Sequence, residues 1–284
     1  MKKIILVAIV IAFALPVSAQ FYGPFYGANV FVNKSNLFNS DDYRADSFQT
    51  YKKTPSFAGN FEIGYLYQTG LSVATGIQFG TCNQKYTGSN NYYPYNLTAT
   101  TKTSSIRIPV IFGIQKMNDK KLKFLYTVGF YYSYNTSYSD KWELTNKVPT
   151  NNVTQVQTYT LKDDIISYEN NINAQVNYSA NLNRRPYQRH GLGALASAGI
   201  KYQLKDKLEL IAQVKTEFTV TNAEITNEIR FTPINDPSTF PYNGHAFQNH
   251  AKFMNDKNSN WNRASTHPFN LGLSIGVRYY LFDF

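Results

Sequence analysis

Residues 71–80 read LSVATGIQFG, and this stretch decides the fold. Its odd-numbered positions hold Leu, Val, Thr, Ile and Phe, whereas its even-numbered positions hold Ser, Ala, Gly, Gln and Gly. Successive side chains of a β-strand point to opposite faces, so this alternation predicts a strand with one apolar face. The opposite face is small and polar, which suits a narrow interior better than a surface in open water.

The same alternation recurs along the chain, and we predict eight strands from it. Their approximate ranges are 25–34, 57–68, 71–82, 103–115, 123–135, 191–204, 208–221 and 269–282. Pro109 lies inside the fourth range. Because proline has no N–H to donate to a neighbouring strand, we expect a bulge at that position.

The connectors between these stretches alternate in length. Those at 69–70, 116–122 and 205–207 are short, whereas those at 35–56, 83–102, 136–190 and 222–268 are long and rich in Asn, Tyr, Ser and Lys. A barrel in an outer membrane has short periplasmic turns and long outward loops. The pattern therefore predicts an all-β fold: an eight-stranded, antiparallel, up-and-down transmembrane β-barrel with long extracellular loops.

The N-terminus has the pattern of a secretory signal peptide. Lys2 and Lys3 form the positive region, residues 4–15 the apolar core, and Val17-Ser18-Ala19 a small-residue cleavage site. An uncleaved anchor is the alternative, but the apolar run is short for a membrane span. We predict a signal peptide at 1–19 and one barrel domain at 20–284, exported to the cell outer membrane. Removing two lysines changes the formal charge from +10 to +8.

The composition agrees with a barrel. Aromatic residues make up 16% of the chain, with 23 Tyr and 20 Phe but only 2 Trp. Membrane barrels concentrate aromatic residues in two girdles at the membrane interfaces. Cys82 is the single cysteine, so no intramolecular disulfide is available, and we expect a buried thiol.

Several charged residues fall on the inward positions of the predicted strands. An eight-stranded barrel has an interior just wide enough for side chains to fill it, and an unpaired charge there would be costly. We therefore predict a plugged lumen with salt-bridge networks. A proton or ion path is the alternative. The predicted lumen network is Glu62, Arg107, Lys201, Glu209, Lys215, Glu217 and Arg278.

Four strand segments resemble a known family. Residues 105–110 (SIRIPV), 126–129 (YTVG), 199–204 (GIKYQL) and 272–279 (GLSIGVRY) are similar to strands of the small outer-membrane β-barrel proteins of Bacteroidota, often grouped as PorT-like. The resemblance covers the strands and not the long loops. It implies a small outer-membrane barrel, and one branch of the family is implicated in type IX secretion.

The long loops hold the candidate surface sites. Arg184, Arg185, Arg189 and Arg263 could contact lipid phosphates near the outer rim, with a solvated basic surface as the alternative. His190 and His267 precede two strands that are not neighbours, and they lie in no recognised catalytic motif, so we predict no enzyme. The spacing of His245 and His250 is weak evidence for a metal, and we predict neither a metal nor a cofactor.

The predicted function is that of a structural or interaction barrel. Its loops would contact outer-membrane lipid or lipopolysaccharide, an envelope protein partner or an external ligand, and its assembly would involve the barrel assembly machinery. An accessory role in a type IX secretion or gliding apparatus is the second hypothesis, and a small-solute porin is the third. The predicted export makes nucleic acid an unsuitable partner, despite the basic charge.

Overall fold

A computed structural model describes residues 21–39, 49–90, 95–116, 121–147, 154–162, 165–170, 178–181, 188–205, 207–223 and 265–281. The predicted signal peptide lies outside these residues. Among the described residues, no helix is long and apolar enough to cross a membrane. The strands are β1 (Phe21–Asn39), β2 (Gln49–Tyr67), β3 (Leu71–Asn90), β4 (Tyr95–Gln115), β5 (Leu122–Lys147), β6 (Thr154–Lys162), β7 (Ile165–Asn170), β8 (Tyr178–Asn181), β9 (His190–Lys205), β10 (Leu208–Thr219) and β11 (Thr266–Tyr280).

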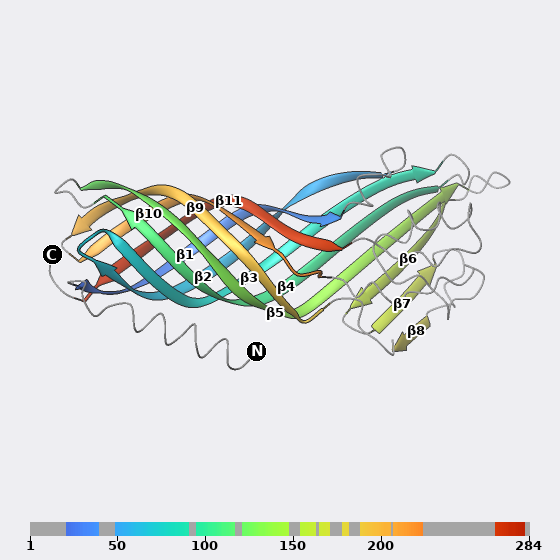
Figure 1. Cartoon of the computed structure of the whole chain (residues 1–284). Coiled ribbons are helices and arrows are strands. Elements are labelled where there is room, and N and C mark those ends of the chain that lie inside the picture. The colour runs from blue at the N-terminus through green and yellow to red at the C-terminus, as the bar shows by residue number, and fades with distance from the viewer. Residues whose placement is uncertain are drawn as a thin grey trace.

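Eight of these strands close into a barrel (Figure 1). The sheet runs β4-β3-β2-β1-β11-β10-β9-β5, and the pairing of β4 with β5 completes the ring. Every pairing around the ring is antiparallel. Each of the eight predicted stretches matches one barrel strand, with ends that differ by two residues or fewer where the prediction runs past the strand, so the prediction of an eight-stranded antiparallel barrel is confirmed.

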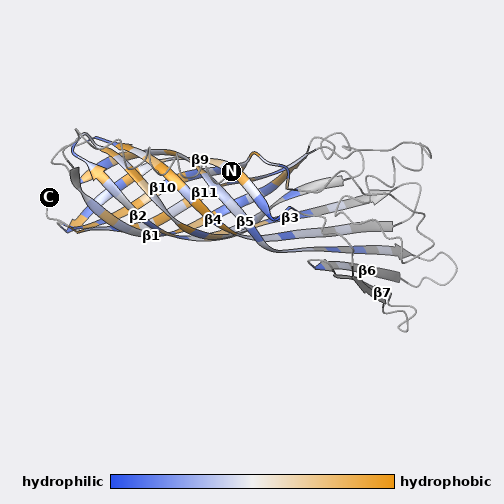
Figure 2. Cartoon of the chain, turned by 60° about the horizontal axis from the view of Figure 1, so that its bottom comes forward, coloured by the Kyte–Doolittle hydropathy of each residue, from blue (hydrophilic) through white to orange (hydrophobic). Residues whose placement is uncertain are grey.

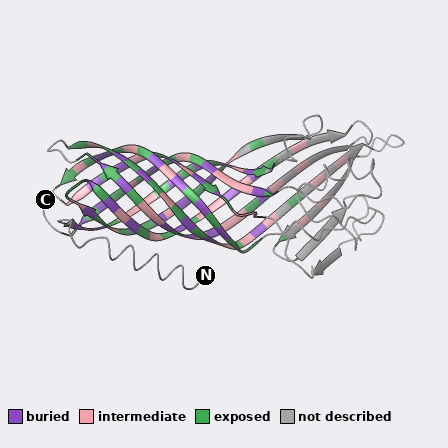
Figure 3. Ribbon diagram, viewed as in Figure 1, coloured by how far each residue is buried: buried purple, intermediate pink, exposed green. Residues whose placement is uncertain are grey.

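The two faces of the wall differ as the alternation predicts (Figures 2 and 3). Val73, Ile77 and Phe79 of β3 lie on the outer face, and the last two are about half exposed (48% and 52%). Ala74 and Gln78 point inward and are buried. The outer apolar band occupies about residues 71–79 of β3 and 106–114 of β4. A strand that crosses a bilayer needs about 9–11 residues, so this band matches a membrane in height.

Exposed aromatic side chains lie at both ends of the apolar band. At the end with the short turns, the rings of Tyr26 and Tyr279 stack on the outer face with centroids 6.4 Å apart. At the other end, Phe57 and Phe79 are exposed on the wall. This distribution is the one that membrane barrels use at the two interfaces.

The turn between β2 and β3 is as short as predicted. Gly70 has a φ of 85°, a left-handed conformation that glycine adopts without steric cost, and its N–H donates to the Tyr67 carbonyl at 2.9 Å. The short turns lie at the end of the barrel where β11 ends, opposite the long extensions (Figure 1).

The long connectors were predicted as loops, and this prediction is wrong in part. β1 continues to residue 39, β3 and β4 reach residues 90 and 95, and β5 runs on to residue 147. β6, β7 and β8 lie inside the predicted loop 136–190 and extend the sheet from β5. The strands beyond the barrel form an open sheet on one side (Figure 1), which we call the outer platform. Away from lipid, a strand needs no apolar face, so hydropathy alternation does not reveal it.

The bulge expected at Pro109 is also absent. Thr75 pairs with Val110 and Gln78 with Arg107, so the β3–β4 register is the same on both sides of the proline. The Thr75 hydroxyl donates to the Pro109 carbonyl at 2.8 Å, which keeps the two strands together where the proline has no donor. The irregularity lies instead in the β4–β5 pairing at Ser104 and Ser105, where β5 has one extra residue, Thr136.

The space around two glycines, Gly76 and Gly59, shows how closely the strands of the wall pack. A Cβ atom on Gly76 would lie 2.8 Å from the Glu62 Cα atom, and backbone cannot easily give way, whereas a Cβ on Gly59 would meet nothing within 4 Å. We expect Gly76→Ala to lower the free energy of unfolding by about 1–3 kcal/mol. Gly59→Ala is the matched control and should change it by less than about 0.5 kcal/mol. Urea unfolding of the barrel in lipid vesicles measures both, and equal values would contradict the close packing at Gly76.

Candidate functional site

The structure places all seven predicted lumen charges inside the barrel. Each side chain is at least 93% buried, because each lies at an inward position of its strand. The residues come from five strands: Glu62 of β2, Arg107 of β4, Lys201 of β9, Glu209, Lys215 and Glu217 of β10, and Arg278 of β11. Four ion pairs connect them. We group these pairs by height in the lumen into an upper cluster and a lower cluster.

The upper cluster is centred on Glu217 and consists of Glu217, Arg107, Lys215 and Gln78. The Glu217 carboxylate accepts from Arg107 and, at 2.7 Å, from Lys215 Nζ. Gln78 Nε2 donates to Glu217 at 2.8 Å, and Lys215 Nζ donates to Gln78 Oε1 at 3.0 Å. β3 and β10 are four strands apart in a ring of eight. The Gln78–Glu217 hydrogen bond therefore crosses the full width of the lumen.

Aromatic and hydroxyl groups complete the upper cluster. The Arg107 guanidinium lies over the Tyr131 ring at 5.3 Å, and its Nε donates to the Ser105 hydroxyl at 3.1 Å. The Tyr131 hydroxyl hydrogen bonds to Thr219 at 2.9 Å. These contacts bind the polar end of each long side chain to a neighbour, as buried polar groups require.

The lower cluster consists of two pairs near the short turns. Arg278 donates twice to Glu62 Oε1, at 2.8 and 3.2 Å, and its guanidinium lies 4.0 Å from the Phe25 ring centre. The second pair joins Lys201 Nζ to Glu209 at 2.6 Å. The Tyr280 hydroxyl donates to the other Glu209 oxygen at 2.8 Å.

An apolar group lies beside the lower cluster. Phe25, Leu66, Ala74 and Tyr280 are buried together, with Ile111 packed against them. Phe25 and Tyr280 also contact each other, with ring centres 5.6 Å apart. This end of the lumen is thus occupied by rings and aliphatic groups as well as by charges.

The two histidines near the rim, His190 and His267, contact aromatic, hydroxyl and main-chain carbonyl groups. His190 hydrogen bonds through Nδ1 to the Tyr132 hydroxyl and packs beside the Tyr134 ring, 5.4 Å away. The Nδ1 of His267 lies 3.1 Å from the Thr219 carbonyl. β9 and β11 are separated by β10, as predicted. A catalytic histidine is typically oriented by a carboxylate, and here the recorded partners are a phenol and a peptide carbonyl.

The remaining predicted surface residues are only partly described. Arg189 is exposed, and its Nη1 donates to the Tyr134 hydroxyl at 3.1 Å. Arg184, Arg185, Arg263, His245 and His250 lie outside the described residues. Within the described ranges, no group of three or more His, Cys, Asp or Glu residues is placed to hold a metal ion. Cys82 is 2% exposed, so the predicted buried thiol is confirmed.

Sequence reasoning missed a set of outward lysines on β1–β6. They lie just beyond the apolar band, on the side of the outer platform, and all are exposed. Strand parity could have found Lys102, which continues the outward positions Ile106 and Ser104 at intervals of two. It could not have found Lys52 and Lys141, because register shifts in β2 and β5 reverse the parity before those positions. We call these lysines the basic belt: Lys34, Lys52, Lys85, Lys102, Lys141 and Lys162.

Solved structures of outer-membrane barrels are similar to this chain at low identity. Neisserial surface protein A is 11% identical with a TM-score of 0.35, and the match covers 92% of this chain and 99% of that chain. Ail of Yersinia pestis, solved in complex with the heparin analogue sucrose octasulfate, is 8% identical with a TM-score of 0.30 and coverage of 90% and 99%. The outer-membrane protease OmpT of Escherichia coli is 6% identical, with a TM-score of 0.40 and coverage of 93% and 99%.

These similarities are limited to the barrel architecture. No protein-family model and no curated protein matches the sequence. The resemblance to PorT-like proteins therefore stays a prediction.

The upper cluster can be tested by removing its carboxylate. Glu217→Ala leaves Arg107 and Lys215 buried without their anion, and breaking a buried pair in this way costs about 3–5 kcal/mol. The control is Glu143→Ala, which removes an exposed partner 3.8 Å from Lys141 and should change stability by less than about 1 kcal/mol. Urea unfolding in lipid vesicles compares the two variants. A loss below 1 kcal/mol for Glu217→Ala would show that the cluster does not stabilise the barrel.

Proposed function

We propose that this chain is an exported outer-membrane protein with a closed lumen and no catalytic role, whose barrel anchors a contact surface outside the membrane. The outward apolar band supports the membrane location, since a face of this kind would otherwise be an aggregation surface in water. The outer platform supports the contact role, because it places several strands beyond the height that a bilayer requires. Lipid, an envelope protein or an external ligand would meet this surface.

The observation that carries the closed lumen is the upper cluster. Glu217 is 1% exposed and is joined to β3 by a hydrogen bond and to β4 by an ion pair, so side chains from far sides of the ring meet in the middle. A water-filled channel would require these groups to separate. Each separation would leave a buried charge or amide without its partner, which is unfavourable.

Conductance of the purified chain in a planar lipid bilayer tests the closed lumen. We expect no steady open channel at moderate voltage. The triple variant Arg107→Ala, Lys215→Ala and Glu217→Ala shortens three side chains at once and leaves no unpaired charge among them. We expect this variant to conduct, because the upper cluster no longer fills the lumen. Steady channels from the unaltered protein would contradict the proposal and favour the small-solute porin.

An accessory role in a type IX secretion or gliding apparatus is a second candidate, and it depends on the resemblance of four strand segments. Chemical crosslinking of intact outer membranes, followed by purification of this chain, tests it. Recovery of secretion components would support that role. Recovery of lipid or lipopolysaccharide without such components would favour an independent contact barrel.

A further inference from the structure

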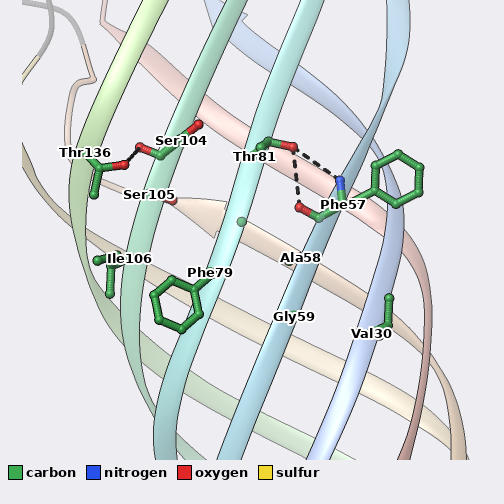
Figure 4. A pocket seen from close by; sticks show the side chains of 11 residues that line it. Val30, Phe57, Ala58, Gly59, Phe79, Thr81, Ser104, Ser105, Ile106 and Thr136 are labelled. Atoms are coloured by element: carbon green, nitrogen blue, oxygen red, sulfur yellow. Dashed lines mark hydrogen bonds between the residues drawn. The ribbon is translucent and has the colours of Figure 1, made fainter.

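A groove lies on the outer face of the barrel wall, and Figure 4 shows the residues that line it. Its volume is about 500 Å³. Val30, Phe57, Phe79 and Ile106 provide apolar walls from four adjacent strands, and the first three are more than half exposed. The groove is continuous with the apolar band, so its natural surroundings are lipid chains.

Gly59 makes the groove possible. It occupies an outward position of β2, and the space where its side chain would be is open for at least 4 Å. The neighbouring outward position on the same strand is Phe61, which is 66% exposed. A missing side chain between the large exposed side chains of Phe57 and Phe61 thus leaves a hollow in the wall.

The platform end of the groove is polar. Thr81 bonds to both main-chain groups of Phe57, at 3.3 and 3.4 Å, and Thr136 donates to the Ser104 carbonyl at 3.2 Å (Figure 4). Beyond these hydroxyls comes the basic belt. Lys102 lies two outward positions, or about 13 Å, along β4 from Ile106. Along the wall toward the outer platform, the apolar groove is therefore followed first by hydroxyl groups and then by the lysines of the basic belt.

The register concentrates positive charge at this end. Lys52 of β2 lies directly opposite Lys85 of β3, and Lys102 of β4 lies opposite Asn83, two residues before Lys85. Like charges directly opposite each other in a sheet are unfavourable. Within the belt, Lys141 has an acidic neighbour in Glu143 at 3.8 Å. An anion bound between Lys52, Lys85 and Lys102 would remove the repulsion.

We propose that the groove and the basic belt form one binding site for a phosphorylated lipid of the outer leaflet. One acyl chain would lie in the groove over Gly59, and the phosphate would contact Lys52, Lys85 and Lys102. The site rests on the proposed function, because it requires the barrel to span a membrane with the platform outward. Lipid is favoured over an acidic protein because the groove opens onto the lipid-facing band. In addition, lysines just outside a membrane attract the anionic head groups of its lipids.

The test measures binding of lipid A with and without its phosphates to the full purified chain, by native mass spectrometry after release from detergent. We expect phosphorylated lipid A to be retained and the dephosphorylated form to bind at least tenfold more weakly. Replacing Lys52, Lys85 and Lys102 together by Gln should weaken binding roughly a hundredfold, at about fivefold for each lysine. Gly59→Leu should weaken it by filling the groove.

Matched controls separate the site from general effects. Lys116→Gln with Lys121→Gln removes two exposed lysines at the short-turn end, and Ala28→Leu enlarges another outward residue of the wall. Both should bind like the unaltered chain. Equal retention of the two lipid A forms, unchanged binding of the triple lysine variant, or unchanged binding of Gly59→Leu would each overturn the proposal.

Insertion into lipid vesicles, followed by protease protection of the barrel, is measured first for every variant. A chain that does not insert contradicts the proposed function itself. A chain that inserts and retains no phosphorylated lipid contradicts only the lipid site.

Discussion

The narrowness of an eight-stranded ring is the constraint on which the rest of this structure depends. Side chains from opposite walls reach each other, so every inward residue must fit those across the lumen as well as those beside it. Gln78 and Glu217 meet in this way at 2.8 Å from strands four places apart. Where a long side chain occupies the middle, a facing residue must be small. The same holds for a residue beside it: Gly27, which pairs with Glu62 on the adjacent strand, leaves room for the Glu62 side chain, which would lie 2.8 Å from a Cβ added there.

The same constraint explains why charges occur inside at all. A lumen lined only by apolar groups would give a strand two similar faces, and its register could slip more easily. Ionic partners at defined heights oppose such a slip. Arg278 must lie level with Glu62, and Lys201 with Glu209, for the four groups to remain paired. The two clusters thus act on register as well as on stability, and they come from strands distributed around the ring.

Much of the barrel could be predicted from the sequence because a wall with an apolar outer face and a small or polar inner face has a strict period of two. The parity of Leu71 to Phe79 assigned both faces of β3, and the same logic identified all seven inward charges. The ion-pair partners could not be predicted, since Glu217 is distant in sequence from Arg107. The outer platform was missed because Tyr95–Thr103 and Thr154–Lys162 lack an apolar face. The groove depends on the absence of a side chain at Gly59, and the hydropathy pattern of the sequence does not reveal such a hollow.

The length of β5 has a mechanical consequence. Its 26 residues run without interruption from the short-turn end of the barrel into the outer platform, a contour of roughly 85 Å at the usual rise of a strand. The tilt of a barrel strand is determined by the number of strands and their stagger. The direction in which the platform extends from the barrel is therefore determined by the geometry of the wall and not by surface residues. A change of stagger between the strands would therefore reorient the whole outer platform relative to the barrel axis.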